Sequence, residues 1–128
     1  MREVGRGAAR RDRAQVPDDL PAAVEFGGAE VIAERAAPVG DVAEAVRVII
    51  DHYETRGDWV IALLGQEGSD KRIRGITMPG KQLHRDWVES VFGPELADHA
   101  GPEDRVVTDL LVVATDVYTW KLLRRDRG

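Results

Sequence analysis

The residues best suited to binding or chemistry lie near the end of the chain, in the stretch LLVVATDVYTWKLLRRD at 110–126. Its apolar start is typical of a buried helix, and hydroxyl, carboxyl and aromatic groups then follow within five positions. Apolar walls with a few convergent polar groups characterise small-molecule pockets between bundle helices. We therefore expect a ligand pocket lined by residues from this stretch and from an earlier helix: His84, Trp87, Thr115, Asp116, Tyr118 and Thr119.

Two alternatives to this pocket stay open for part of the set. Tyrosine and tryptophan also fill apolar cores when their polar atom finds a partner, and this interpretation is as good as a pocket for Trp87 and Tyr118. Thr115, Asp116 and Thr119 suit a subunit contact as well as a pocket.

The same residue types give little support to metal or catalytic chemistry. The histidines, His52, His84 and His99, are all at least 15 positions apart, whereas a zinc peptidase helix needs two histidines four apart. The chain has no cysteine, which excludes thiolate metal ligands and disulfides. The stretch RGITMPGK lacks the serine or threonine of a phosphate-binding loop. We expect no metal, no cofactor and no enzymatic activity, and His84 with Asp116 is the one acid–base pair that could suggest otherwise.

The helices that must position these residues show in the apolar periodicity. Val42, Val46, Ile49 and Tyr53 share one helix face, and Asp41 is placed to cap that helix. The pattern predicts a helix that ends at residue 57, a sharp turn, and a short buried helix over 59–66 capped by the aspartate at 58.

Two further helical segments follow. The segment 69–92 contains Pro79, and a proline inside a helix costs about 3 kcal/mol, so we expect a break near 77–80 and a firm helix over 81–92. The stretch GPELADHAGPEDR is rich in turn residues, and a single long helix is predicted over 102–125. The fold class is therefore predicted to be all-α, an antiparallel helical bundle.

Composition and charge limit the partners of this bundle. A chain of 128 residues suits one domain, which we place at 31–128 after an irregular or flexible leader at 1–30. A short helix is expected over 30–36, before Pro38 and Gly40. Residues 1–13 hold five arginines and two carboxylates, a net charge of +3, so the rest carries −8 of the total −5. An acidic body is a poor partner for nucleic acid. No apolar run approaches the roughly 20 residues that span a bilayer, and the absence of cysteine fits the cytoplasm.

Three segments resemble the C-terminal half of tetracycline-repressor-type (TetR family) transcriptional regulators. They are VRVIIDHYETRGDWVIALLGQE, GKQLHRDWVESVFGPEL and LVVATDVYTWKLLRRD, and they occur in the order found in that family. The resemblance covers about 31–126 and implies an all-helical regulatory domain that binds a small effector and forms dimers. An apolar or aromatic effector is the expected ligand.

The resemblance also implies parts that this chain lacks. Residues 1–30 are too short for the family's helix-turn-helix head, and the chain stops before the last helix that helps form the dimer. We therefore expect a truncated regulator that does not bind DNA by itself and would be a homodimer if the terminal helix were present. Trp120, Leu123 and Arg124 are expected at the dimer surface or exposed to solvent. The alternative is a ligand-free helical module that pairs with an intact paralogue.

Overall fold

The structure, a computed structural model, describes residues 28–98 and 101–127 of the chain. These residues form helices and turns with no strand among them, which confirms the predicted all-α fold class. The expected leader at 1–30 lies almost wholly outside the described residues. A helical segment at 28–34 comes first and is followed by α3 (Val42–Gln66), α4 (Lys71–Val91), α5 (Gly93–Ala97), α6 (Pro102–Ala114), α7 (Val117–Lys121) and a π-helical turn, η1 (Leu122–Asp126).

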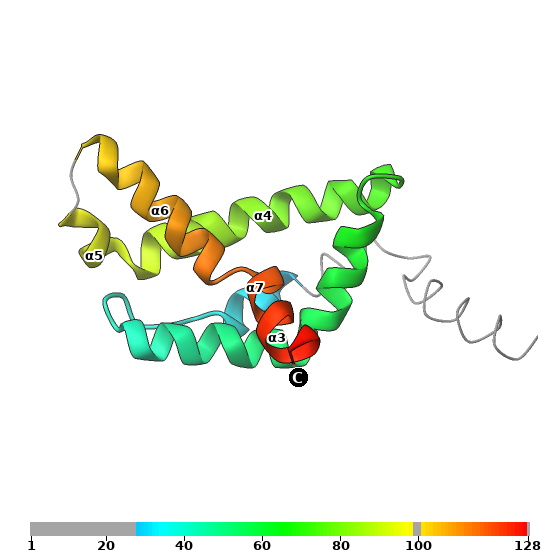
Figure 1. The fold of residues 1–128 in the computed structure, drawn as a ribbon, viewed down its shortest axis with the longest axis horizontal. Coiled ribbons are helices and arrows are strands. Elements are labelled where there is room, and N and C mark those ends of the chain that lie inside the picture. Colours follow the sequence, from blue (N-terminus) through cyan, green and yellow to red (C-terminus); the bar gives the residue numbers. More distant parts are fainter. Residues whose placement is uncertain (1–27, 99–100, 128) are drawn as a thin grey trace, which may run out of the picture.

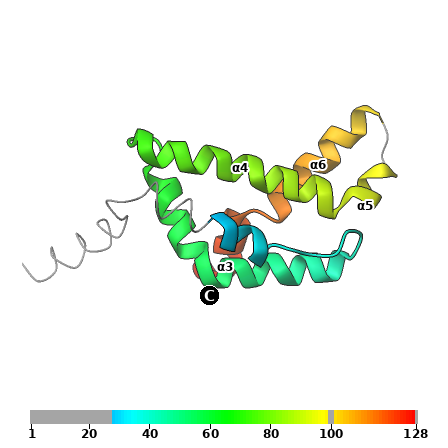
Figure 2. The ribbon, with the colours of Figure 1, turned by 180° about the vertical axis from the view of Figure 1, so that it is seen from behind.

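Two long helices frame the molecule, and the shorter elements lie against them. Figure 1 shows α4 across the top of the view and the first part of α3 along the bottom, while the second part of α3 climbs to meet α4. From behind, Figure 2 shows the segment 28–34 lying between α3 and α4. Helix α6 packs on α4 and leads into α7, which packs on α3. The centre of the molecule is therefore enclosed by α3, α4, α7 and the segment 28–34.

Helix α3 is continuous, so the predicted break after Gly57 is wrong. Its start is as predicted, because the Asp41 carboxylate accepts a hydrogen bond from the Glu44 amide at 3.1 Å. Asp58 does not cap a second helix and instead pairs with Arg125, with 3.0 Å between Oδ1 and Nε. Figures 1 and 2 show the axis of α3 changing direction along its course, so a bend within one helix takes the place of the predicted turn.

Helix α4 is also continuous and runs through Pro79, where the sequence predicts a break. Proline removes one amide donor and crowds the carbonyl four positions earlier, which belongs to Gly75. Both residues are exposed, so water can satisfy the freed carbonyl and the helix loses little. Glu67 also holds the two sides of the proline together, because it accepts hydrogen bonds from the Thr77 hydroxyl and, at 2.8 Å, from Lys81 Nζ.

The predicted single helix over 102–125 is divided, and the connection before it contains the short helix α5. Helix α6 ends at Ala114 because Asp116 takes an extended conformation, with ψ of 153°. The Asp116 carboxylate accepts a hydrogen bond from the Tyr118 amide at 3.0 Å and so caps α7. A side chain that satisfies a backbone amide in this way competes with the continuation of a helix. The break lets α7 pack on α3 while α6 packs on α4.

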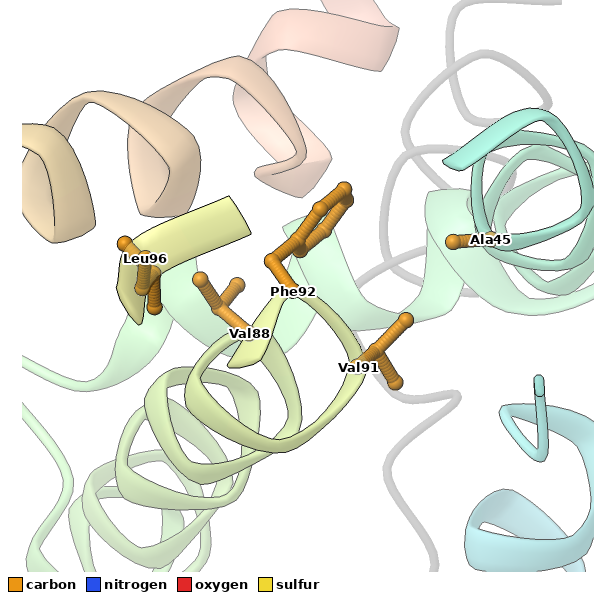
Figure 3. Close-up of a cluster of buried hydrophobic side chains, with 5 residues drawn as sticks. All are labelled: Ala45, Val88, Val91, Phe92 and Leu96. Carbon is orange, nitrogen blue, oxygen red and sulfur yellow. The ribbon is translucent and has the colours of Figure 1, made fainter. Parts of the chain in front are cut away.

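Three groups of buried apolar side chains join these helices. In the first, shown in Figure 3, the end of α4 lies between α5 and the start of α3 through Val88, Val91, Phe92, Leu96 and Ala45. The second joins α3 to α7 through Ile49, Tyr53, Val117 and Trp120. The third joins the end of α3 to the start of α4 through Leu63 and Ile73. Each aliphatic side chain that is fully buried contributes about 1.5–3 kcal/mol.

Replacing Gly57 with alanine should destabilise the protein, although glycine is the poorer helix former. A Cβ atom placed at Gly57 would lie within 2.9 Å of three atoms of the Trp120 ring, which is buried and has little room to withdraw. Overpacking costs about 1–3 kcal/mol, whereas the gain in helix propensity is about 1 kcal/mol. We expect Gly57→Ala to lower the free energy of unfolding in urea by about 1–2 kcal/mol.

Gly65→Ala is the matched control, because Gly65 lies in the same helix and a Cβ atom added there would have no atom within 4 Å. This substitution should raise the free energy of unfolding by up to about 1 kcal/mol. If both substitutions stabilise the protein, the close contact between Gly57 and Trp120 is not present in solution.

Candidate functional site

A pocket of about 160 Å³ lies between α3, α4, the start of α7 and the segment 28–34. Its walls are largely aliphatic, with side chains from all four elements: Val31, Val60, Leu64, Ile76, Leu83 and Val117. A dry apolar cavity of about 150 Å³ in another protein binds benzene. The pocket therefore has room for a molecule of about one aromatic ring.

Arg35 is the most unusual residue of the pocket lining, because its charged side chain is only 6% exposed. Burial lowers the pKa of Arg35, and the guanidinium still keeps its charge at neutral pH. Its Nη2 donates a hydrogen bond to His84 Nδ1, and its Cζ lies 5.3 Å from the centroid of the Trp87 ring. Its Nε has no hydrogen-bond partner among the described residues.

His84 is a neutral imidazole whose two nitrogens are both engaged. Because arginine can only donate, His84 Nδ1 must accept, and the ring proton therefore sits on Nε2. Nε2 lies 3.2 Å from the Val112 carbonyl oxygen and 3.1 Å from Thr115 Oγ1. Burial, together with the nearby charge of Arg35, lowers the pKa of His84 to about 4. At neutral pH the imidazole is consequently a fixed polar group rather than a cation.

Trp87 and Tyr53 fix the positions of Arg35, His84 and Thr115 through hydrogen bonds and ring stacking. Trp87 Nε1 donates to the Arg35 carbonyl oxygen at 2.6 Å, and its ring stacks on His84 with 5.9 Å between centroids. The Tyr53 hydroxyl donates to the Thr115 carbonyl oxygen at 2.7 Å, which ties α3 to the break between α6 and α7. Burial raises the pKa of Tyr53, so this hydroxyl stays protonated and remains a donor.

A second set of charges fixes the segment 28–34 to α3. Arg56 pairs with Glu34 at 2.7 Å and with Glu30 at 3.0 Å. Glu34 Oε1 also lies 3.0 Å from Nδ1 of the buried His52. The hydrogen bond from Arg56 holds the pKa of Glu34 below its usual value, and burial lowers the pKa of His52. These contacts set the position of Arg35, which follows Glu34 directly.

The structure brings together four of the six predicted site residues. His84 and Asp116 line the pocket, Thr115 lies against His84, and Trp87 supports the site from outside the lining. Trp87 thus lies at the margin of both the core and the site.

Tyr118 and Thr119 do not belong to this site. Tyr118 is 48% exposed and outside the pocket lining. The Thr119 hydroxyl donates to the Val113 carbonyl oxygen at 2.6 Å and serves the local chain turn. Both residues belong to α7, which Asp116 caps and which packs on α3.

Trp120 was expected at an exposed or dimer surface, and the structure instead buries it. Its ring is only 5% exposed and packs on Gly57 and Tyr53, because α7 turns onto α3. Leu123 is exposed as expected, at 57%. Arg124 is also exposed and pairs with Glu54 at 2.6 Å.

Sequence reasoning missed Arg35 and Tyr53 as parts of the site. Arg35 lies in a short segment, AEVIAERAAPV, that has too few residues to show which face is buried. Its contacts with His84 and Trp87 span 49 and 52 positions of the chain. The one local signal is a charged pair, Glu34–Arg35, which interrupts the apolar residues between Val31 and Val39.

Within 28–98 and 101–127 no group of three or more histidine and acidic side chains is placed to hold a metal ion. No helix of these residues is long and apolar enough to cross a membrane. Comparisons with protein-family models, curated proteins and solved structures found no match to this chain. The function must therefore be argued from the pocket and the sequence.

The pKa of His84 predicts how stability depends on pH. Between its usual pKa of 6.5 and about 4, the unfolded chain binds a proton that the folded chain does not. The free energy of unfolding should therefore fall as the pH drops from 7 to 5, by about 1–2 kcal/mol from this residue alone. His84→Gln keeps an acceptor for Arg35 and should flatten this dependence, measured by urea denaturation at several pH values.

His52→Gln is the matched control, since His52 is the other buried histidine among the described residues and its pKa is also lowered. It should flatten the same curve less than His84→Gln does. An unchanged slope in His84→Gln would contradict the neutral, buried state of this imidazole.

Proposed function

We propose that residues 31–128 form a small-molecule-binding regulatory domain of the TetR type. The observation that carries this proposal is the apolar pocket of about 160 Å³, into which Arg35, His84 and Asp116 bring polar groups. Pockets between helices with this composition are typical ligand sites. The sequence resemblance to TetR-type effector domains, which includes the residues around His84 and Asp116, supports the same function.

The hydrogen bonds that His84 and Asp116 already make favour ligand binding over catalysis as the function of the pocket. A general base needs a free lone pair, and on His84 one nitrogen is protonated while the other accepts from Arg35. The Asp116 carboxylate already accepts from the Tyr118 amide. These groups are therefore suited to orienting a ligand rather than to moving a proton.

A ligand in this pocket would contact the first residues of the domain and could change their position. Val31 and Arg35 form part of the lining. The TetR resemblance implies that a DNA-binding head would precede this segment. A ligand that prefers one position of this segment would shift the population of that position by its difference in affinity. We place the domain in the cytoplasm, in accordance with this role and with the absence of cysteine.

The exposed face of α6 supports a second role, as a surface that pairs with another helical chain. Val106, Leu110 and Val113 are spaced by four and three positions and are 58%, 63% and 63% exposed. This spacing places them on one side of the helix. An apolar stripe of this kind is typical of helix–helix contacts, and dimerisation is the other function that the TetR resemblance implies.

Neutral ring-sized molecules should bind in the pocket and stabilise the fold. We expect indole or toluene at millimolar concentration to raise the melting temperature of the full chain, since a ligand that binds only the folded state stabilises it. Leu83→Trp should abolish this rise because Leu83 lines the pocket and the larger ring would occupy its volume. Differential scanning fluorimetry measures both effects.

Leu110→Trp is the matched control, because Leu110 is exposed on α6 and lies outside the pocket lining. It should keep the response to both molecules. If neither indole nor toluene, nor any single-ring compound of a wider panel, stabilises the wild-type chain, the ligand-binding function is wrong.

Pairing through α6 should be sensitive to a charge on its apolar stripe. We expect Leu110→Glu to weaken self-association, because it would bury a carboxylate in the contact. Sedimentation velocity over a range of concentrations measures the change, with Met78→Glu on the exposed side of α4 as the control. A wild-type chain that is monomeric at every concentration, or association unaffected by Leu110→Glu, excludes this surface as a site of self-pairing.

A further inference from the structure

The basic residues around the pocket pair with carboxylates, with one exception. Three basic residues line it: Arg35, Arg56 and Lys81. Arg56 pairs with Glu34 at 2.7 Å, and Lys81 pairs with Glu67 at 2.8 Å. Arg35 forms no ion pair with a carboxylate of the described residues, although it is the most buried of the three.

A buried charge without a counter-ion is costly, so the way in which Arg35 is held is informative. Its partners are the neutral His84 imidazole, the face of the Trp87 ring and the protonated Tyr53 hydroxyl, none of which carries a negative charge. Trp87 also fixes the backbone of Arg35 through its hydrogen bond to the carbonyl oxygen. The guanidinium is thus held in place beside the pocket, while Nε is left without an acceptor among the described residues.

Asp116 is the acidic residue of the pocket lining, and it does not replace a counter-ion for Arg35. One of its carboxylate oxygens accepts from the Tyr118 amide and caps α7. Burial lowers the pKa of Arg35 and outweighs the favourable effects of the Tyr53 hydroxyl, which hydrogen-bonds to it, and of the negative charge of Asp116. Further anionic acceptors would therefore stabilise this guanidinium.

We propose that the pocket binds a small aromatic or aliphatic carboxylate, whose apolar part lies against the aliphatic walls and whose carboxylate pairs with Arg35. This proposal rests on the ligand-binding function proposed above and names the class of ligand. A guanidinium matches the planar, two-oxygen geometry of a carboxylate. One uncompensated cation fits a single negative charge better than a phosphate, and a volume of about 160 Å³ fits about one ring.

Benzoate and benzamide make a direct test, since they share a ring and a planar head group and differ in charge. We expect benzoate to bind the full wild-type chain roughly tenfold or more tightly than benzamide, because hydrogen bonds between charged groups are the stronger ones. Isothermal titration calorimetry measures both affinities at low salt, and the preference should shrink as ionic strength rises.

Arg35→Met removes the charge and keeps much of the side-chain volume, and such replacements of buried charges are often well tolerated. It should abolish the preference for benzoate while leaving benzamide binding within a few-fold of wild type. Arg85→Met is the matched control, because Arg85 lies on α4 outside the pocket lining and pairs with Asp109 at 2.8 Å. It should leave the preference intact. If Arg35→Met fails to fold by circular dichroism, Arg35→Gln takes its place.

The outcomes separate the ligand class from the ligand-binding function. Benzamide binding as tightly as benzoate, or a preference for benzoate that survives Arg35→Met, overturns the carboxylate assignment and leaves the pocket as a site for neutral molecules. Absence of binding by benzoate and benzamide, together with no response to indole or toluene, overturns the ligand-binding function itself.

Discussion

The close contact between the Trp120 ring and the backbone of Gly57 is the constraint on which the rest of the structure depends. No other residue type leaves room for the ring, because any Cβ at this position would overlap it. With Trp120 seated on α3, α7 lies across that helix rather than extending from α6. The start of α7 then brings Asp116 and Val117 to the wall of the pocket. A packing requirement at one glycine thus determines the position of a polar wall of the site.

The second constraint is the cost of burying charge. Around the pocket the partly buried Arg56 and the exposed Lys81 pair with carboxylates, whereas the buried Arg35 is held by neutral groups. The first arrangement binds elements together, as Arg56 does between α3 and the segment 28–34. The second leaves a charge without a negative partner among the described residues. This distinction separates the ionic contacts that join elements of the fold from the cation for which we propose a ligand carboxylate as the partner.

Apolar periodicity predicts that the helices exist and says much less about where they end. The average cost of proline in a helix predicts a break at Pro79, yet this residue lies on an exposed face where water can satisfy the carbonyl it frees. Gly57 has the sequence context of a helix stop, whereas its missing side chain makes room for a ring from a distant helix. The sequence pattern predicts that Asp116 lies inside one long helix and lines a pocket. In the structure Asp116 does line the pocket, but it also divides the predicted helix into two. In each case the local signal is real, and a contact or solvent exposure elsewhere in the fold decides its effect.

The sequence by itself determined the helical class, the capped start of α3 and the presence of His84, Thr115 and Asp116 at one site. The helical class and the capped start follow from apolar periodicity and from side chains acting on their own backbone, which are properties of a few neighbouring residues. The site was expected because polar groups lie among the apolar positions of two predicted helices. Only the tertiary structure decided that Arg35 lies at the site, that Tyr118 lies outside it and that Trp120 is buried. Arg35 meets His84 across 49 positions and Tyr53 meets Thr115 across 62. Contacts of that range depend on how whole helices bend and cross, because only the packed chain brings such distant residues within reach of one another.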